Sequence, residues 1–287
     1  MRLGLVVLTY NRSDALLAVL RSLAAQCRGD EVVVVADDGS ASDHVQALRE
    51  GMPAFAVPVQ HVWHPDVGFT AGRARNLGAR AARQAGADYL VFLDGDCVPG
   101  PRWLAAHRQL AEAGCFVNGS RVLLDPALTA QVCSGLDLGG AGIADWLQWR
   151  LKGQVNKLSH LWCWPAMPGR HEAAFRWRGI RSCNFGLAWQ DFSEVNGFDE
   201  TFSGWGHEDA DLVLRLHNIG LRRKNGHWAT EVLHLWHREA SRANESANRA
   251  RVVARQAQGT VRAAVGLEEA GLDDRVQVSA LTARQGA

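Results

Sequence analysis

The alternation of short apolar runs with helix-patterned segments constrains the fold of this chain most. The runs from Leu3 to Thr9 and from Glu31 to Asp37 are rich in valine, which is typical of parallel strands covered on both faces. Between them, Ser13 and Asp14 mark the start of a helix. Apolar residues then recur at helical spacing, namely Leu16, Leu17, Leu20, Leu23 and Ala24. The pattern predicts a strand–helix–strand unit of a doubly wound α/β sheet.

The same alternation continues along the chain. We expect a third strand near Val57 to Val62, a helix from about Thr70 to Gln84 and a fourth strand from Tyr89 to Leu93. Because ligands of open parallel sheets bind outside the carboxyl ends of the strands, a nucleotide is the expected ligand there. The sequence has neither a Gly-x-Gly-x-x-Gly after its first strand nor a Walker-type Gly-Lys-Ser/Thr. Their absence disfavours a dinucleotide enzyme and a P-loop ATPase. The strand ends are polar: Thr9-Tyr10-Asn11, Asp37-Asp38-Gly39-Ser40 and Asp94-Gly95-Asp96.

Composition narrows the class of protein further. The 31 basic and 30 acidic residues give a formal charge of +1, so we expect no nucleic-acid partner. The six cysteines form no Cys-x-x-Cys pair, which predicts reduced core residues rather than a zinc knuckle or a disulfide framework. No apolar run approaches the length of about 18 residues that a membrane span needs. These features predict a cytoplasmic protein, soluble or peripheral at the inner face of a membrane.

Two elements could supply metal ligands. Asp94 and Asp96 lie two apart at the end of an apolar strand, so both carboxylates face one side, where they suit a divalent cation that bridges diphosphate oxygens. Asp-Gly is also a common turn. His234 and His237 are three apart, and both can bind one ion only if the strand ends or turns between them. We therefore expect His237 as the imidazole ligand, with either Mg²⁺ or Mn²⁺ as the ion.

A Trp- and Gly-containing turn precedes a cluster of carboxylates between Gly204 and Leu212. The indole of Trp205 offers a flat face for a sugar ring, Gly206 lets the backbone approach a ligand, and Glu208 or Asp209 can accept a proton from a hydroxyl. This combination suits chemistry on a carbohydrate. The alternative is that these acidic residues complement the dipole in the first turn of a helix that runs to Ile219.

The segment 145–181 interleaves aromatic and basic residues. It favours either a peripheral contact with an anionic membrane or a grip on an acceptor that carries phosphate or sugar. An irregular insertion whose tryptophans fill the core is the alternative. Beyond it, we expect a strand from Ala229 to His237, a helix from Ser241 to Val265 and, from Asp273 onward, a frayed tail with no clear motif. The tryptophans of the segment are Trp146, Trp149, Trp162, Trp164 and Trp177.

Two groups of motifs resemble known families. TYNR, VVADDGS, GFTAGRARNLGAR and FLDGDCVP resemble the nucleotide half of family-2 glycosyltransferases of GT-A fold, including their Asp-x-Asp motif. NFGLAW, NGFDE, GWGHEDADL and HLWH resemble the carboxyl-terminal half of β-1,4-galactosyltransferases and chondroitin-polymerase domains. The resemblance implies a Rossmann-like, mixed, mostly parallel sheet flanked by helices, with an acceptor-binding subdomain. It divides the chain into a nucleotide-sugar half (1–123), an acceptor and catalytic half (124–240), and a helix with a tail (241–287).

The resemblance also assigns roles to single residues. It makes Asp209 the catalytic base, Asp96 the principal metal ligand and His237 the metal histidine. It places Asp94 towards the ribose and the metal, and Arg75 with Asn76 near the nucleotide. The remaining contacts that it implies are Asp37 or Asp38 with the uracil, Thr9, Tyr10 and Asn11 along the nucleotide, and Gly186, Trp205, Gly206 and Glu208 against the sugars.

The function implied is an inverting, metal-dependent transfer of a hexose or N-acetylhexosamine from a UDP-sugar to a hydroxyl of a glycan or lipid-linked acceptor. His207 and His234 replace a glycine and a methionine of the animal galactosyltransferases, so the acceptor pocket, the metal preference and the donor sugar do not transfer with the fold. A sugar nucleotidyltransferase is a second interpretation, but it needs a glycine-rich, basic loop after the first strand. A non-catalytic saccharide-binding subunit is the third.

Overall fold

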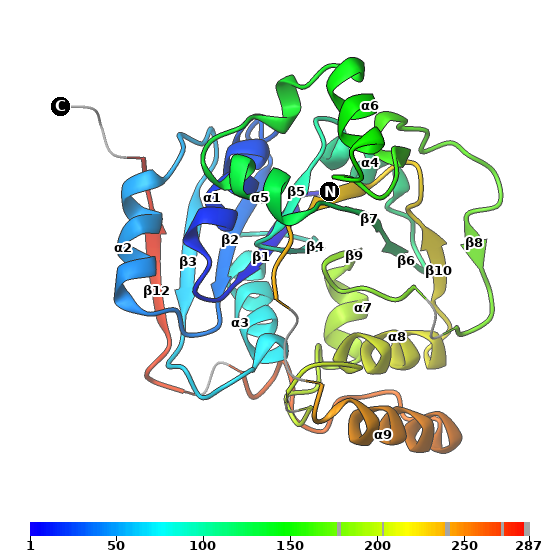
Figure 1. Ribbon diagram of the computed structural model, residues 1–287. Helices are drawn as coiled ribbons and strands as arrows, with labels where there is room; N and C mark the ends of the chain where they lie inside the picture. The colour runs from blue at the N-terminus through cyan, green and yellow to red at the C-terminus, as the bar shows by residue number, and fades with distance from the viewer. Residues whose placement is uncertain (177–178, 203, 239–241, 271–272, 284–287) are drawn as a thin grey trace.

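The computed structural model describes residues 1–287 except 177–178, 203, 239–241, 271–272 and 284–287. Figure 1 shows a twisted sheet flanked by helices. The first elements are β1 (Leu3–Thr9), α1 (Ser13–Ala24), β2 (Glu31–Asp37), α2 (Ser42–Gly51), β3 (Val59–Trp63), α3 (Ala71–Gln84), β4 (Tyr89–Asp94), β5 (Cys97–Pro99), α4 (Trp103–Leu110), β6 (Cys115–Asn118) and β7 (Ser120–Leu123).

The second part of the chain completes the same sheet. Its elements are α5 (Pro126–Cys133), η1 (Leu138–Gly140), α6 (Ile143–Leu151), η2 (Ser159–Leu161), β8 (His171–Glu172), β9 (Asn184–Ala188), α7 (Trp189–Glu194), α8 (Glu208–Asn218), β10 (Arg222–Asn225), β11 (Glu231–His234), α9 (Glu245–Gln258) and β12 (Gln277–Leu281). The strand order of the large sheet is β12-β3-β2-β1-β4-β9-β6-β10-β8. The expected mixed α/β architecture is confirmed.

Parallel pairing brings the polar strand ends together. In the register of the sheet, Thr9 at the end of β1 pairs with Asp37 at the end of β2, and Leu8 pairs with Asp94 at the end of β4. Strands β9 and β12 instead pair antiparallel with β4 and β3. The candidate ligand groups of the first half therefore share one edge of the sheet, as the sequence predicts.

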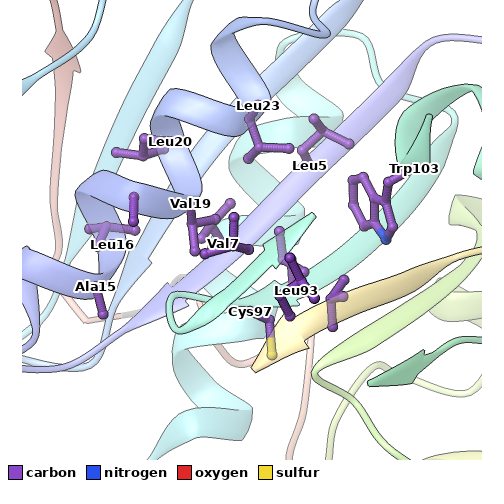
Figure 2. Packing of buried hydrophobic residues seen from close by; sticks show 14 of the residues in the cluster. Leu5, Val7, Ala15, Leu16, Val19, Leu20, Leu23, Leu93, Cys97 and Trp103 are labelled. Carbon is purple, nitrogen blue, oxygen red and sulfur yellow. The ribbon is translucent and has the colours of Figure 1, made fainter. Parts of the chain in front are cut away.

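Helices cover both faces of the first-half strands. Val19 of α1 and Val7 of β1 belong to one buried cluster, which Figure 2 shows from close by. Val6 points to the opposite face because side chains alternate along a strand. There α3 packs closely on β1, since a Cβ at Gly78 would lie only 2.7 Å from Val6 Cγ1. The absence of a side chain at Gly78 thus lets α3 lie close against β1 and β2.

A short second sheet, β5-β11-β7, is joined to the large one through Asn184. The buried amide oxygen of Asn184 accepts hydrogen bonds from Trp103 Nε1 at 3.1 Å and from His107 Nε2 at 3.0 Å. Its amide nitrogen donates to the carbonyl oxygens of Ser120, at 3.1 Å, and Thr230. Burial lowers the pKa of His107 to about 4, so its ring stays neutral. The side chain of Asn184 therefore ties the start of β9 to the starts of β7 and β11 in the small sheet.

The structure also corrects several boundaries. The strand expected from Ala229 to His237 covers only Glu231–His234. Of the helix expected from Ser241 to Val265, Ser241 lies outside the described residues, and α9 covers Glu245–Gln258. The tail holds β12, which pairs with the open edge of β3, so the expectation of an unstructured tail was wrong. All six cysteines are free, as predicted. Among the described residues, no helix has both the length and the apolar character of a membrane span.

We predict that Asn184→Leu lowers the free energy of unfolding by roughly 2–4 kcal/mol, because it leaves several buried donors and acceptors unpaired. Denaturant unfolding followed by tryptophan fluorescence measures the change. The exposed Gln148 on α6 offers a control, and Gln148→Leu should stay within about 0.5 kcal/mol of the parent chain. A loss below about 1 kcal/mol at position 184 would contradict the role given to its amide.

Candidate active site

Three predicted metal ligands converge at the end of β11. Asp96 Oδ2 lies 3.3 Å from His237 Nε2, and Asp96 Oδ1 lies 3.8 Å from His234 Nε2. Each residue offers one ligand atom, and these atoms all lie within 4.8 Å of one another. Strand β11 ends at His234, so the chain can turn between the two histidines, which is the condition that the sequence sets for both to face one ion.

The chemistry of this group fits a divalent cation. His237 Nδ1 lies 2.9 Å from the carbonyl oxygen of Arg238 and donates to it, so Nε2 is the ring nitrogen that faces Asp96 and could bind an ion. Burial lowers the pKa of His234, which favours the neutral, ligating form of that ring. One carboxylate and two imidazoles leave coordination positions open for oxygens of a ligand.

A second group, Glu112 with Cys115 and His171, has similar spacing. There Lys224 Nζ lies 2.6 Å from Glu112, so a cation already neutralises the carboxylate. We therefore assign no metal to it.

A buried arginine connects the two halves of the site. Arg75 of α3 is only 3% exposed, and its Nη2 donates to Asp94 Oδ1 at 2.8 Å. Its Nη1 lies 3.6 Å from Glu208 Oε1 at the start of α8. Burial lowers the pKa of Arg75, but the charges of Asp94 and Glu208 outweigh burial and raise it. Within the described chain, Nη1 and Nε make no hydrogen bond, although Nη1 faces Glu208.

Asp209 sits beside this pair in the first turn of α8. Burial and the charge of Glu208 raise its pKa to about 7, while the backbone N–H groups of Ala210 and Ser182 and the charge of Arg75 act in the opposite direction. The N–H of Ala210 donates to Asp209 Oδ1 at 2.7 Å. A carboxyl group with this pKa changes protonation near neutral pH, which suits a general base.

The turn before α8 has an unusual backbone. Gly204 and Gly206 have φ of 71° and 106°, and His207, which caps α8, has φ of 69°. Left-handed conformations of non-glycine residues are uncommon and gather at functional sites. Asn248 of α9 donates to the carbonyl oxygen of Gly206 at 2.9 Å, so α9 supports the turn.

The half-exposed Trp205 lies in the same turn. The guanidinium of Arg242 lies 4.8 Å from the centre of its ring, so one face of the indole has a cation–π partner.

The residues expected along the nucleotide line the end of β1 and β2. Tyr10 is exposed, and its hydroxyl donates to Asp66 at 2.9 Å. Asn11, with φ of 48°, accepts from the N–H of Ala41 at 2.8 Å. The buried carboxylates of Asp37 and Asp38 are held within the protein. Their hydrogen-bonding or ion-pair partners are His61 and Ser40 for Asp37, and Thr70 and His64 for Asp38, while Thr9 contributes its carbonyl oxygen to the N–H of Asp38.

Two expected contacts lie elsewhere in the structure. Asn76 is wholly buried and exchanges hydrogen bonds with the backbone of Phe198, so its amide holds the NGFDE turn rather than facing a nucleotide. Gly186 lies inside the sheet, where a Cβ would meet Tyr89 Oη at 3.0 Å and His107 Nδ1 at 3.1 Å. Its missing side chain makes room for these residues and not for a sugar, because Gly186 lies between Val91 of β4 and Val117 of β6 in the sheet.

A network of buried charges that the sequence did not predict fixes α8. Arg255 of α9 donates to Asp211 Oδ1 at 2.7 Å and to Asp199 Oδ2 at 2.8 Å. Arg215 donates to Asp211 Oδ2 at 2.9 Å. Asp211 is therefore a structural carboxylate, whereas its neighbours Glu208 and Asp209 face the site. Within the acidic cluster, Asp211 is thus held by two arginines, whereas Glu208 lies beside Arg75. The only available signal was the spacing of Asp211 and Arg215 by one helical turn.

Comparisons with known proteins agree with this geometry. Residues 5–126 match the family described as glycosyl transferase family 2, and residues 170–238 match the family described as the N-terminal domain of galactosyltransferase. The chain is 32% identical over 233 residues to a validoxylamine A glucosyltransferase of Streptomyces hygroscopicus subsp. jinggangensis, covering 76% of this chain and 52% of the relative. It is 27% identical over 241 residues to a chondroitin synthase of Escherichia coli, covering 76% and 32%.

Solved structures share the fold. Residues 1–349 of S. aureus TarS, in complex with UDP-GlcNAc, superpose with a TM-score of 0.60 at 14% identity, covering 94% of this chain and 69% of that one. The mannosyltransferase PcManGT of Pyrobaculum calidifontis, in complex with GDP-Man and Mn²⁺, gives a TM-score of 0.53 at 16% identity, covering 92% and 65%.

Fold and matches together define the class of structure: the chain has the GT-A fold of its structural neighbours. Its first half is similar to glycosyl transferase family 2, and its second half is similar to the N-terminal domain of galactosyltransferase. The chain spans about half the length of the validoxylamine A glucosyltransferases that it matches.

We predict that Asp209→Asn stabilises the metal-free protein at pH 8. The pKa of Asp209 lies above its ordinary value in the folded state, so stability falls as pH rises from about 4 to about 7 and the carboxyl loses its proton. An amide never takes up this charge, and the gain should reach at least about 1 kcal/mol at pH 8 and vanish near pH 4. Thermal unfolding in EDTA across this range measures it. Asp43→Asn, at an exposed carboxyl, should show no such trend, and an equal profile for both variants would contradict the assignment.

Proposed function

We propose that the chain transfers a sugar, a hexose or an N-acetylhexosamine, from a UDP-sugar to a hydroxyl of a glycan or lipid-linked acceptor, with inversion and with a divalent cation. The observation that carries the proposal is the buried Arg75, which contacts Asp94 of the first half and Glu208 of the second. It links the cation cluster to the candidate base. The printed names of the relatives, a glucosyltransferase and a chondroitin synthase, support a sugar-transfer reaction.

The donor side of the mechanism uses the cluster at Asp96. When bound there, Mn²⁺ or Mg²⁺ would neutralise charge on the diphosphate leaving group. Asp96, His237 and His234 would hold the ion, and the two imidazoles make Mn²⁺ as acceptable as Mg²⁺. Asp94 would contact the ribose, and the N–H groups of Arg75 that make no hydrogen bond would donate to diphosphate oxygens. The same solved structures that share the fold contain UDP-GlcNAc or GDP-Man with Mn²⁺.

The acceptor side uses Asp209 as the general base. The acceptor hydroxyl loses its proton to Asp209 while its oxygen forms a bond to the anomeric carbon. The bond from that carbon to the diphosphate oxygen breaks, and its electron pair leaves with UDP. Base and leaving group lie on opposite faces of the sugar, so the configuration inverts and no protein nucleophile is needed. Glu208 and Trp205 lie next to Asp209 and would contact the two sugars.

The rival interpretations lack support in the structure. A nucleotidyltransferase needs a loop that cradles a triphosphate after β1, but there the side chain of Asn11 accepts from Ala41 and that of Arg12 contacts Asp14 at 3.3 Å. A purely saccharide-binding subunit needs neither a clustered cation site nor a carboxyl with a pKa near neutrality. The combination of Asp96, His237 and Asp209 favours an enzyme.

Asp209→Asn should lower kcat by about 10²–10⁴-fold, since it removes the proton acceptor, while the dissociation constant for UDP with Mn²⁺ changes less than about threefold. Coupled detection of UDP release gives kcat, and calorimetry gives the dissociation constant. Asp43→Asn serves as the control, with activity unchanged. Turnover at the parent rate in the position-209 variant would remove this residue from the mechanism.

Asp96→Asn should abolish the rise in Tm that Mn²⁺ together with UDP produces in the parent protein, because the shared carboxylate of the cluster is lost. Differential scanning fluorimetry with and without Mn²⁺ measures this. The matched control is Glu112→Gln in the group already neutralised by Lys224, where the Mn²⁺ effect should persist. If Glu112→Gln abolished the Mn²⁺ effect and Asp96→Asn did not, the cation would bind at the Glu112 group, and the assignment to Asp96 would be contradicted.

A further inference from the structure

Three tryptophans outside the candidate active site are exposed on neighbouring loops. Trp162, Trp164 and Trp228 have 62%, 54% and 42% of their surface exposed. The N–H of Trp164 donates to the carbonyl oxygen of Trp228 at 2.7 Å, so the two loops lie side by side. We call these three residues the tryptophan platform. Exposed indoles at this density are unusual for a surface without a ligand.

A buried arginine holds the platform rigid. Arg170 is 3% exposed and donates four hydrogen bonds of 2.5–2.8 Å, all to backbone carbonyl oxygens. The acceptors belong to both loops: Trp164, Pro165, Asn225 and His227. Because the guanidinium of Arg170 bonds to both loops, it fixes the position of one loop relative to the other. The tryptophans are therefore displayed on a fixed frame, as binding sites for rigid ligands require.

The backbone of Trp228 carries strain that its exposed side chain does not explain. Its φ is 57°, in the left-handed region that bulky residues rarely adopt. The carboxylate of the buried Glu231 accepts from the N–H of Trp228 at 2.7 Å and holds it there. Such conformations persist only where the surrounding structure imposes them, and they gather at ligand sites. Burial cannot be the reason for this geometry, since the indole is not packed into the core.

The tryptophan platform lies within reach of the cation cluster along the chain. Trp228 precedes β11, and His234 of the cation cluster ends it. The six intervening steps of chain span at most about 20 Å. A saccharide whose end hydroxyl is at the reacting centre would need only a few more sugar rings to reach the indoles.

We propose that the tryptophan platform is a subsite for the non-reacting part of the saccharide acceptor, whose sugar rings stack on the indoles. The inference rests on the proposed glycosyl transfer and extends it to the substrate: the acceptor is an oligosaccharide, not a single sugar. Aromatic faces with a polar N–H suit sugar rings, which have apolar faces and hydroxyl edges. Indoles also bind at lipid surfaces, but the fixed frame that Arg170 imposes favours rigid sugar rings over a fluid surface.

Binding and kinetics with oligosaccharides of defined length test the proposal. The probes are disaccharides and hexasaccharides of hyaluronan and of cellulose, titrated calorimetrically into the parent protein and into the double variant Trp164→Ala/Trp228→Ala. We expect one hexasaccharide to bind more tightly than its disaccharide, and the double variant to lose about tenfold of the hexasaccharide affinity only. Trp164→Phe/Trp228→Phe should retain most of it. Leu151→Ala, at a side chain 89% exposed on α6, should have no effect.

Two further readouts separate this inference from the proposed function. Hydrolysis of a UDP-sugar with Mn²⁺ should be equal in the parent and the double variant, because the platform touches neither donor nor cation. If the parent hydrolyses no UDP-sugar, the proposed function fails, while the binding titration still decides the platform. Hexasaccharide affinity that is equal in parent and double variant, or absent in both, would overturn the subsite. So would a double variant that loses only its binding to anionic phosphatidylserine vesicles.

Discussion

The burial of one positive charge, that of Arg75, is the constraint on which the site depends. A guanidinium that is 3% exposed is tolerated only with carboxylates beside it. Asp94 comes from the end of β4 and Glu208 from the start of α8, more than a hundred residues later in the chain. The two ion pairs of Arg75 therefore bring the Asp-x-Asp turn close to the acidic turn of the second half. The positions of Asp96 and Asp209 follow from those of their neighbours.

The same arrangement explains why one carboxyl group is left with a pKa near neutrality. Arg75 hydrogen-bonds Asp94 and faces Glu208. The other nearby arginines are bonded elsewhere, Arg255 of α9 to Asp199 and Arg215 of α8 to Asp211. Asp209 is largely removed from water beside the negative Glu208, with only partial compensation by Arg75 and two backbone N–H groups, so its pKa rises to about 7. The protein accepts a locally unfavourable charge at this position, which is typical of catalytic groups. The strained backbone at His207 belongs to the same region.

Much of the fold and part of the site could be predicted from the sequence. The valine-rich runs and polar strand ends predicted the parallel half of the sheet. The family resemblance predicted that Asp96 and His237 would meet, and both histidines were expected there only if the strand ended between them. A motif does not show whether a given side chain faces the ligand or the protein interior. Asn76 and Gly186 were therefore assigned to ligands, although both pack inside the protein. Pairings between distant segments were also invisible. Asn184, the bonds of Arg255 and the pairing of β12 with β3 depend on tertiary contacts that no local pattern records.

The most direct test of the account is a crystal structure of the protein with Mn²⁺ and an intact, non-hydrolysable UDP-sugar analogue. The account predicts the ion at ligand distance from Asp96 and His237, the diphosphate between this ion and Arg75, and the carboxylate of Asp209 on the face of the sugar opposite the diphosphate. A diphosphate bound away from the Asp96 cluster, or a carboxylate of Asp209 turned away from the anomeric carbon, would contradict it.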